Sequence, residues 1–253
     1  PVQGLGRYEV KLQPLPLPDQ RHIHLPEGFT WLVADSGRTA AESLMDMLIA
    51  SGHKAVLLQL ADKPAKSSHP AYTLAARDED SLLQTLAGIR SEHGQIGGLI
   101  CLQTAGVDAK AIRNCFVAKE YAVQQQLFML VKALQSDLLD SAAQGHASLL
   151  VAGQLDGMLG LGGVRGYPLV SAGVSGLVKS LHHEWPQVRC RYVDLQPKMA
   201  DEQALHALWQ ELHDVDCQPL EVGRDGQGRR TTLVLCDAPL AESKPALDDK
   251  DVV

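Results

Sequence analysis

The sequence predicts an α/β fold in which a parallel sheet is covered by helices on both faces. Short apolar runs, typical of buried strands, alternate along the 253 residues with longer stretches of helical periodicity. Glycine or proline separates most of these segments. Hydrophobic residues make up 45% of the chain and charged residues 21%, an ordinary globular composition that can fill a substantial core.

The N-terminal half carries the predicted elements in a regular order. Residues 7–12 alternate like a strand, and the prolines that follow keep the next residues extended. FTWLVAD (29–35) is an apolar run bounded by glycines, which indicates a buried strand. A helix over 78–94 is marked by an acidic start and a final glycine. The other elements predicted here are helices at 39–52 and 117–140, strands at 54–60 and 97–103, and a short strand at 71–76.

The C-terminal half continues the alternation. Its predicted strands lie at 147–153 and 188–195, and its helices at 170–185 and 201–214. Residues 219–237 form a predicted hairpin, because DGQG provides turn residues between two strand-like runs. Together the elements indicate a truncated Rossmann-like sheet, a degenerate form of the short-chain dehydrogenase/reductase fold.

Bulk properties exclude several classes of protein. The formal charge is −7 and Lys and Arg are scattered, which argues against nucleic acid as a partner. No apolar run approaches the roughly 20 residues that span a bilayer, and no secretory signal is present. Five cysteines without a C-x-x-C pair predict reduced thiols in a cytoplasmic protein. Because the chain starts at Pro1 and stops at a strand-like DVV, we expect it to be an excised piece of a longer polypeptide.

The first strand-to-helix turn, ADSGRTAAES, is poorly suited to a dinucleotide. A pyrophosphate site needs glycines that let the backbone approach and a helix N-terminus that supplies N–H donors. Here Gly37 is the single glycine, Asp35 places a carboxylate where pyrophosphate would lie, and Arg38 offsets it only in part. We interpret Asp35 or Ser36 as a helix cap. The sequence therefore predicts no cofactor-binding residue in this chain.

The catalytic pattern of short-chain reductases is also missing. These enzymes use a Ser after the fifth strand, a Tyr, and a Lys four residues beyond the Tyr that lowers its pKa. Tyr167 is followed four residues later by Ser171, and Thr104 replaces the Asn of an Asn-Ala-Gly element. No Ser occurs at the end of the corresponding strand, which reads Ala152, Gly153, Gln154. We therefore predict no catalytic residue.

Other motifs favour structural interpretations. Adjacent residues His182, His183 and Glu184 point about 100° apart on a helix and cannot form a metal-binding pair. His22 and His24 could share one side of an extended segment, but no third ligand is near in the sequence. The glycines at 157–166 lack the Lys-Ser/Thr of a phosphate-binding P-loop, so we interpret this segment as a mobile loop. We predict no metal site.

A family resemblance rests on residues 176–197, GLVKSLHHEWPQVRCRYVDLQP. They resemble the Gly-Leu-x-(Arg/Lys)-x-Leu…Glu-(His/Trp)-Pro…Val-Asp-Leu signature near the end of the structural subdomain of polyketide synthase ketoreductases. The Trp185-Pro186 form is most similar to bacterial polyunsaturated fatty acid synthases, and the resemblance covers nearly the whole chain. Further landmarks follow in the same order at YEVKLQPLPLP (8–18), LFMLVKALQ (127–135), QLDGMLGLGG (154–163) and EVGRDGQGRRTTLVL (221–235).

The resemblance implies a division of labour. In that family the first half of the ketoreductase binds no cofactor and braces the second, which carries the NADPH loop and the catalytic residues. It implies an N-terminal strand and proline-rich segment (1–28), a structural subdomain (29–237) and a linker (238–253) toward a catalytic subdomain absent from this chain. Expected partners are that subdomain and the acyl carrier protein domains of a multidomain synthase. The alternative is a docking or interaction module without a reductase role.

Overall fold

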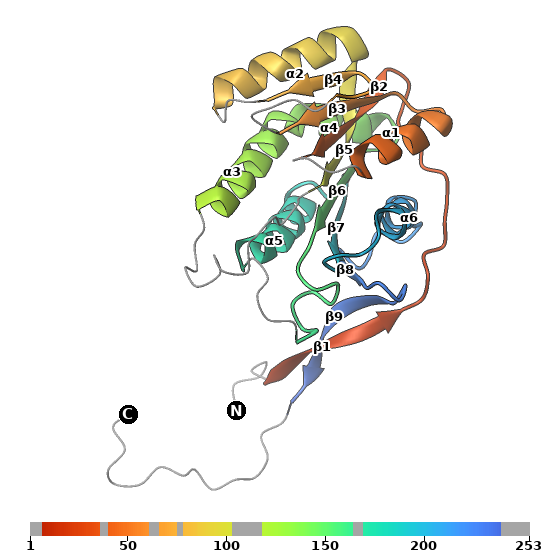
Figure 1. Cartoon of the computed structure of the whole chain (residues 1–253), viewed down its shortest axis with the longest axis vertical. Coiled ribbons are helices and arrows are strands. Elements are labelled where there is room, and N and C mark those ends of the chain that lie inside the picture. The colour runs from red at the N-terminus through yellow and green to blue at the C-terminus, as the bar shows by residue number, and fades with distance from the viewer. Residues whose placement is uncertain are drawn as a thin grey trace, which may run out of the picture.

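Figure 1 shows the computed structural model of the chain. The structure describes residues 7–35, 40–60, 66–74, 78–102, 118–163 and 169–238, with the side chains of the helices starting at 118 and 169 described from 124 and 172 onward. Residues 1–6, 36–39, 61–65, 75–77, 103–117, 164–168 and 239–253 lie outside the described residues, and with them the last two residues of the strand predicted at 71–76.

The strands form one nine-stranded sheet in the order β1-β9-β8-β7-β6-β5-β2-β3-β4. Neighbouring strands from β4 to β8 are parallel, whereas β9 is antiparallel to both β8 and β1. In chain order the parallel strands follow the arrangement of a Rossmann sheet, with its switch point between β2 and β5. The strands are β1 (Tyr8–Leu15), β2 (Phe29–Asp35), β3 (Ala55–Gln59), β4 (Ala71–Thr73), β5 (Gln95–Leu102), β6 (Ser148–Gly153), β7 (Arg189–Leu195), β8 (Glu221–Arg224) and β9 (Arg230–Asp237).

Helices cover both faces of the sheet (Figure 1). One face packs against α2 (Glu79–His93), α3 (Ala118–Ala133), α4 (Gln135–Gln144) and α5 (Leu169–Glu184). The other packs against α1 (Ala40–Ala50) and α6 (Asp201–Leu212). The central strands are buried along their whole length, which explains why they read as continuous apolar runs rather than alternating ones.

The helix predicted over 117–140 is in fact two helices, α3 and α4, and the second ends at Gln144. Leu134 lies between α3 and α4 with φ −97° and ψ 0°, and its side chain is fully buried in the core. Both helices still face the same side of the sheet, so the apolar stripe continues through the break. The prediction was wrong about continuity because a small change in backbone direction leaves the hydrophobic pattern almost unchanged.

The first and last strands form a ribbon that projects from the body of the domain (Figure 1). We call this pair, β1 with β9, the terminal ribbon. Both described ends of the chain lie at its tip, where the Ala238 N–H donates to the Arg7 carbonyl at 2.9 Å. The antiparallel pairing of β8 with β9 confirms the hairpin predicted over 219–237. The antiparallel pairing of β1 with β9 was not predicted, so the sheet is mixed rather than parallel throughout.

Residues 16–28 link the ribbon to β2 and run past α6 (Figure 1). This strap pairs with the segment after α6: Arg21 N–H donates to the His213 carbonyl at 2.8 Å, and Val215 N–H to the Asp19 carbonyl at 2.9 Å. An isolated antiparallel bridge joins Gln20 to Asp214 between these two bonds. The extended proline-rich segment is thus held by backbone hydrogen bonds.

Candidate functional site

The carboxyl ends of the parallel strands are where a Rossmann-like sheet binds its ligands. At the switch point β2 ends at Asp35 and β5 ends at Leu102, and both residues are buried. Asp35 is the last residue of β2 and the described part of α1 begins at Ala40, so the interpretation of Asp35 or Ser36 as a helix cap falls on a turn outside the described residues and stays a prediction. Ser36, Gly37 and Arg38 lie outside the described residues.

After β6, the glycine-rich loop 154–163 closes around two of the chain's own carboxylates. Asp194 of β7 accepts backbone N–H groups of Leu155 at 2.6 Å, Leu159 at 2.8 Å and Asp156 at 3.4 Å. The Asp156 carboxylate in turn accepts the N–H groups of Met158, Gly160 and Gly162 at 2.8–2.9 Å. Interpreting this segment as a mobile loop was therefore wrong for its described part, since its backbone donors converge on buried acceptors.

Close backbone contacts fix the same loop against the sheet. A Cβ on Gly157, whose φ is +74°, would lie 2.6 Å from the Arg224 carbonyl oxygen. A Cβ on Gly223 of β8 would lie 2.5 Å from the Gly157 carbonyl oxygen. Because neither position tolerates a side chain, the two glycines let loop and strand meet backbone to backbone.

The position predicted to lack the catalytic Ser has no room for one. Gly153 ends β6, and a Cβ there would lie 2.3 Å from the hydroxyl oxygen of Tyr192. Tyr192 is fully buried on β7, and its hydroxyl has no hydrogen-bond partner among the described residues. A buried tyrosine thus occupies the space beside the strand end where short-chain reductases place their Ser.

Burial dominates the electrostatics of this region. It raises the pKa of the Asp194 carboxyl to about 7, with a further rise from Asp156, while the N–H donors of Leu155 and Leu159 act in the opposite direction. Burial also raises the pKa of Tyr192 well above its ordinary value, and the carboxylates of Asp194, Glu221 and Asp156 add to this. A phenol in such surroundings is a poor proton donor.

A pKa near 7 is what a general acid or base requires, so Asp194 needs a geometric test. Its side chain is completely buried, and both of its oxygens already accept backbone N–H groups. Neither oxygen faces a cavity from which a substrate could be reached among the pockets that the described residues line. The backbone N–H groups that Asp194 accepts hold the loop in place.

Glu221 of β8 ties the sheet to helix α5. Lys179 Nζ lies 3.0 Å from both carboxylate oxygens of Glu221, and the Ser175 hydroxyl donates to the same group. Lys179 belongs to the family-like segment 176–197, and in this chain it links α5 to β8.

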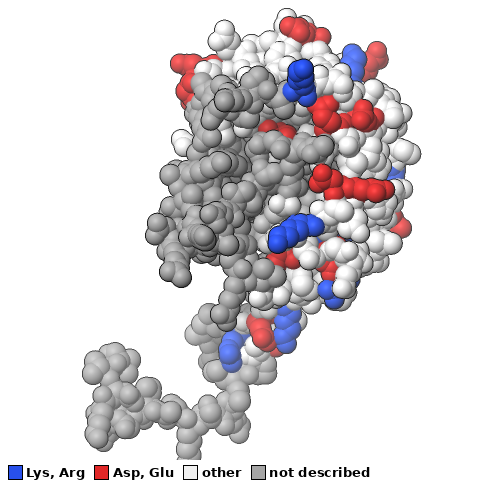
Figure 2. Space-filling view, in the orientation of Figure 1, with Lys and Arg blue, Asp and Glu red and all other residues white. Residues whose placement is uncertain are grey.

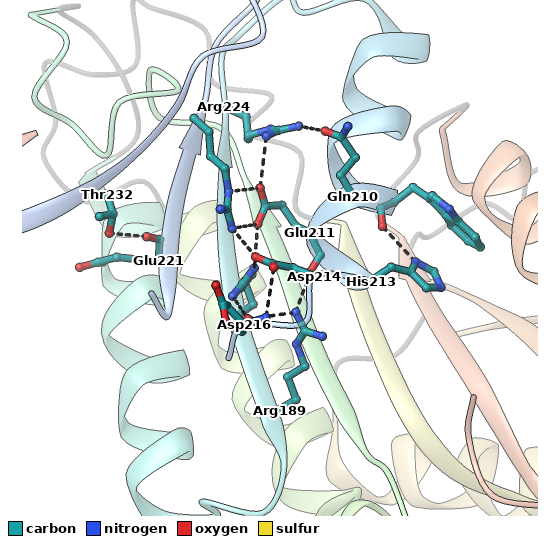
Figure 3. A network of polar contacts seen from close by, with 12 residues as sticks. Arg189, Gln210, Glu211, His213, Asp214, Asp216, Glu221, Arg224 and Thr232 are labelled. Carbon is teal, nitrogen blue, oxygen red and sulfur yellow. Dashed lines mark hydrogen bonds and ion pairs between the residues drawn. The ribbon is translucent and has the colours of Figure 1, made fainter. Parts of the chain in front are cut away.

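A second polar cluster, buried between α6, the strap and the last strands, was not predicted (Figure 3). Glu211 is fully buried and contacts three arginines: Arg191 at 2.8 Å, Arg230 at 2.8 and 2.9 Å, and Arg224 at 3.4 Å. Asp214 contacts Arg191 at 2.7 Å and Arg230 at 2.5 Å. We call these five residues the arginine–carboxylate cluster.

Backbone carbonyls complete the cluster. Arg191 donates to the Asp216 carbonyl at 2.6 Å, and Arg230 to the Pro16 carbonyl of the strap at 3.2 Å. Arg189 lies beside it and donates to the carbonyls of Glu211 and Asp216, while burial and the neighbouring Arg191 lower its pKa to about 10. The cluster therefore joins β7, α6, β8, β9 and the strap.

The sequence held one signal for this cluster. Glu211 falls at helical spacing on the apolar face of α6, together with Ala204, Leu208 and Leu212. A charge on a buried stripe must find a partner, because a lone buried carboxylate is strongly destabilising. Only the tertiary structure, however, assigns the arginines on β7, β8 and β9 to it.

Histidines predicted not to bind metal lie at the other end of the sheet. His22 and His24 have ring centroids 6.3 Å apart, and His22 also meets His213, while His24 meets His53. Within the part of the chain that the structure describes, no group of three or more His, Cys, Asp or Glu residues is placed to hold a metal ion. His183 and Glu184 are exposed at the end of α5 and His182 is half-buried.

The cysteines that the structure describes differ in burial. Cys101 and Cys190 are buried, and burial raises the pKa of each thiol to about 12. Cys236, which lies in a strand-like run of the sequence, is only partly buried on the terminal ribbon, and Cys217 is exposed. Cys115 lies outside the described residues.

No helix that the structure describes is long and apolar enough to span a bilayer.

Thr104, Tyr167 and Ser171, which the sequence analysis compared with the catalytic pattern, have no described side chains. The described residues nearest to that pattern are Gly153 and the loop after it. In these, the space and the hydrogen-bonding groups are used by Tyr192, Asp156 and Asp194.

Charged side chains give no single binding face in the view of Figure 2. Acidic and basic residues of the described chain are interspersed there rather than gathered into one basic area. This distribution agrees with the scattered Lys and Arg of the sequence.

No protein-family model matches the sequence. No curated protein sequence matches it either.

Solved structures do resemble the fold. An N-terminal ketoreductase from the macrolactin assembly line superposes with a TM-score of 0.66 at 12% identity, over 94% of this chain and 46% of that one. An adenylation, ketoreductase and pseudo-Asub structure of a keto acid-selecting NRPS module gives 0.61 at 16% identity, over 91% of this chain and 18% of that one. A metagenomic short-chain oxidoreductase in complex with NADP gives 0.58 at 16% identity, over 78% of this chain and 97% of that one.

This chain thus spans less than half the length of the two ketoreductase-containing chains. Identities of 12–16% show the fold and leave activity open. The chain has the α/β, Rossmann-like fold of short-chain dehydrogenases and reductases, which confirms the fold class predicted from the alternation of strands and helices in the sequence.

Proposed function

We propose that this chain is the non-catalytic structural half of a β-ketoreductase domain in a multidomain polyketide or polyunsaturated fatty acid synthase. It braces a second half that binds NADPH and reduces a β-ketoacyl chain held on an acyl carrier protein. The chain itself uses no cofactor. The observation that carries the proposal is the carboxyl end of β6, where the protein's own groups fill the space that a reductase uses for chemistry.

That end of the sheet supports a bracing role in detail. Six backbone N–H groups of loop 154–163 bind two carboxylates of the same chain, and Tyr192 blocks the strand end at Gly153. Opening this region to a substrate would break the hydrogen bonds by which the loop's N–H groups bind Asp194 and Asp156. A rigid, closed strand end suits a scaffold better than an active site.

The family-like segment 176–197 supports the same role. Lys179 binds Glu221, Trp185 is buried in the core, and Asp194 closes the glycine-rich loop. Each of these three side chains stabilises contacts between elements. The residues that carry the resemblance therefore have structural roles within this chain, and these roles account for them without contact to a substrate.

The terminal ribbon offers the surface for the second half. Directly opposed residues share one face, which is apolar at Val10 with Leu235 and at Leu12 with Leu233. Tyr8, Val10 and Leu235 are 54%, 47% and 70% exposed. Apolar side chains that are this exposed can be shielded from water by a binding partner. A stable contact would bury about 800 Å² on each side. We call this surface the apolar ribbon face.

A complementation experiment tests the proposal. The catalytic half of the parent reductase is expressed alone and assayed for NADPH-dependent reduction of a model β-ketothioester, with and without this chain added in trans. We expect low activity and a low melting temperature without the chain, and recovery of both with it. Leu235→Asp on the apolar ribbon face should weaken complementation at least about tenfold, since it buries a charge in an apolar contact.

Two controls make this result specific. Leu83 is 43% exposed on α2, away from the ribbon, and Leu83→Asp should complement like the natural chain. Tyr167→Phe should also leave reduction nearly unchanged, because we assign Tyr167 no catalytic role. A thousandfold loss with Tyr167→Phe in a folded protein would contradict that assignment.

The alternative function is a docking or interaction module of a synthase without a reductase role. A catalytic half that is fully active, with an unchanged melting temperature in the absence of this chain, would favour that alternative and remove the bracing proposal.

A further inference from the structure

The outer edge of β1 is unpaired among the described residues, because β1 is the first strand in the sheet order and only β9 adjoins it. An exposed edge strand is a template for pairing with another strand. This edge is separate from the apolar ribbon face, since backbone groups point sideways within the sheet whereas side chains point out of it.

The register shows which backbone groups the edge presents. Ala238 N–H donates to the Arg7 carbonyl, so Arg7 and the alternate residues Glu9 and Lys11 form the hydrogen-bonded pairs with β9. The residues between them, Tyr8, Val10 and Leu12, must then direct their N–H and C=O groups to the outer edge. Pro14, the next outward residue, has no N–H and ends the stretch that can pair.

Charge along this stretch is self-complementary. In an antiparallel pair of two β1 strands with Val10 opposite Val10 of the second copy, Tyr8 lies opposite Leu12 and Glu9 lies opposite Lys11. All the outward-directed groups then meet in hydrogen-bonded pairs. A shift by two residues in one direction sets Glu9 against Glu9, and in the other direction Lys11 against Lys11, which repel.

We propose that this chain pairs with a second copy of itself through the outer edges of β1, in the register centred on Val10. The two-fold axis makes the contact isologous, so each Glu9–Lys11 pair occurs twice. In the single chain Glu9 and Lys11 contact each other at 3.2 Å and are 62% and 54% exposed, so exchanging partners costs little. The two apolar ribbon faces become one continuous surface. This proposal is independent of the reductase role.

Sedimentation equilibrium of the full chain over a concentration series tests it. The natural chain should form a dimer, and Glu9→Lys or Lys11→Glu should each weaken dimerisation at least about tenfold, because two attractive pairs become repulsive. The double variant E9K/K11E should restore it. Mixing the two single variants should also restore association, as a heterodimer, because their charges are then complementary.

Two further variants separate edge pairing from other causes. Val10→Pro removes an outward N–H without touching the β1–β9 ladder, so the dimer should be lost while the melting temperature of the monomer is kept. Glu202→Lys, at an exposed position of α6, makes the same change in net charge as Glu9→Lys and should leave the dimer intact. A monomer at every concentration would overturn the proposal. So would a dimer insensitive to Glu9→Lys and Val10→Pro, or an edge that pairs only with the catalytic half.

Discussion

At the residue scale, the buried carboxyl of Asp194 determines how the loop after β6 packs at the end of the strand. Its position in the Val-Asp-Leu part of the family-like segment placed it on a strand, and the structure adds what it does there. It collects three backbone N–H groups from the loop after the neighbouring strand. Asp194 thereby fixes the loop after β6 against β7.

The raised pKa of Asp194 predicts a measurable pH dependence. Its pKa is about 7 in the folded chain against an ordinary value of 3.8, so the folded state holds the proton over an interval in which the unfolded state has lost it. The stability from this group is complete below pH 3.8 and is lost as the pH rises through 7. Asp194→Asn cannot ionise. Its deficit in unfolding free energy relative to the natural chain should therefore be about 2 kcal/mol larger at pH 5 than at pH 7.5.

Urea unfolding at the two pH values measures this difference. The comparison with the variant is needed because burial lowers the pKa of His146, to about 4, and of His53 and His213, so these groups contribute the opposite trend. Asp140→Asn, on the exposed side of α4, is the control and should change stability little at either pH. An equal deficit for Asp194→Asn at both pH values would contradict the prediction.

At the scale of elements, the arginine–carboxylate cluster predicts a large effect from one conservative change. Glu211→Gln leaves Arg191, Arg224 and Arg230 buried with one carboxylate fewer, which should lower the unfolding free energy by about 3–5 kcal/mol. The matched control is Glu79→Gln. Glu79 and its partner Lys132 are 58% and 61% exposed and 3.1 Å apart, and this loss should stay below about 1 kcal/mol.

Equilibrium unfolding in urea, read by circular dichroism, compares the two variants. If Glu211→Gln is too unstable to purify, Glu211→Asp keeps the charge and should give an intermediate loss. A loss for Glu211→Gln no larger than that of Glu79→Gln would show that the cluster does not hold its elements together.

The elements also show what sequence patterns can and cannot predict. Apolar runs such as 29–35 and 188–195 predicted the buried strands, because a strand covered on both faces leaves a continuous signal. Leu134 broke the long helix without altering the apolar stripe, so the pattern could not reveal the break. Pairings distant in sequence left still less trace: nothing local links Arg230 to Glu211, or the loop after β6 to Asp194.

The candidate site was predictable only in part. The absent Ser, Lys and glycines could be read directly as missing groups. What fills their space could not, because Tyr192 and Gly153 lie 39 positions apart and meet only when β6 and β7 pair. In the sequence, the glycines of 154–163 suggested a flexible backbone. In the structure, Gly157 is needed because the loop approaches the backbone of β8 too closely for a side chain.

At the scale of the whole molecule, the sheet combines a parallel part with an antiparallel terminal ribbon. The parallel strands keep the arrangement that elsewhere positions a dinucleotide, while the terminal ribbon brings both described ends of the chain to one projecting tip. A domain arranged in this way can retain the Rossmann-like framework as a scaffold and act through its surface.

The framework alone should not bind the cofactor. We predict that the isolated chain binds no NADPH with useful affinity. Asp35 ends β2 at the switch point and is buried, so a pyrophosphate placed there would meet a carboxylate shielded from water. Two like charges in that setting should cost several kcal/mol, on the order of what converts a micromolar site into one too weak to detect. Titration calorimetry of the chain with NADPH should give no heat of binding, whereas the chain joined to its catalytic half should give one. A micromolar dissociation constant for the chain alone would contradict both this prediction and the assignment of the cofactor to the other half.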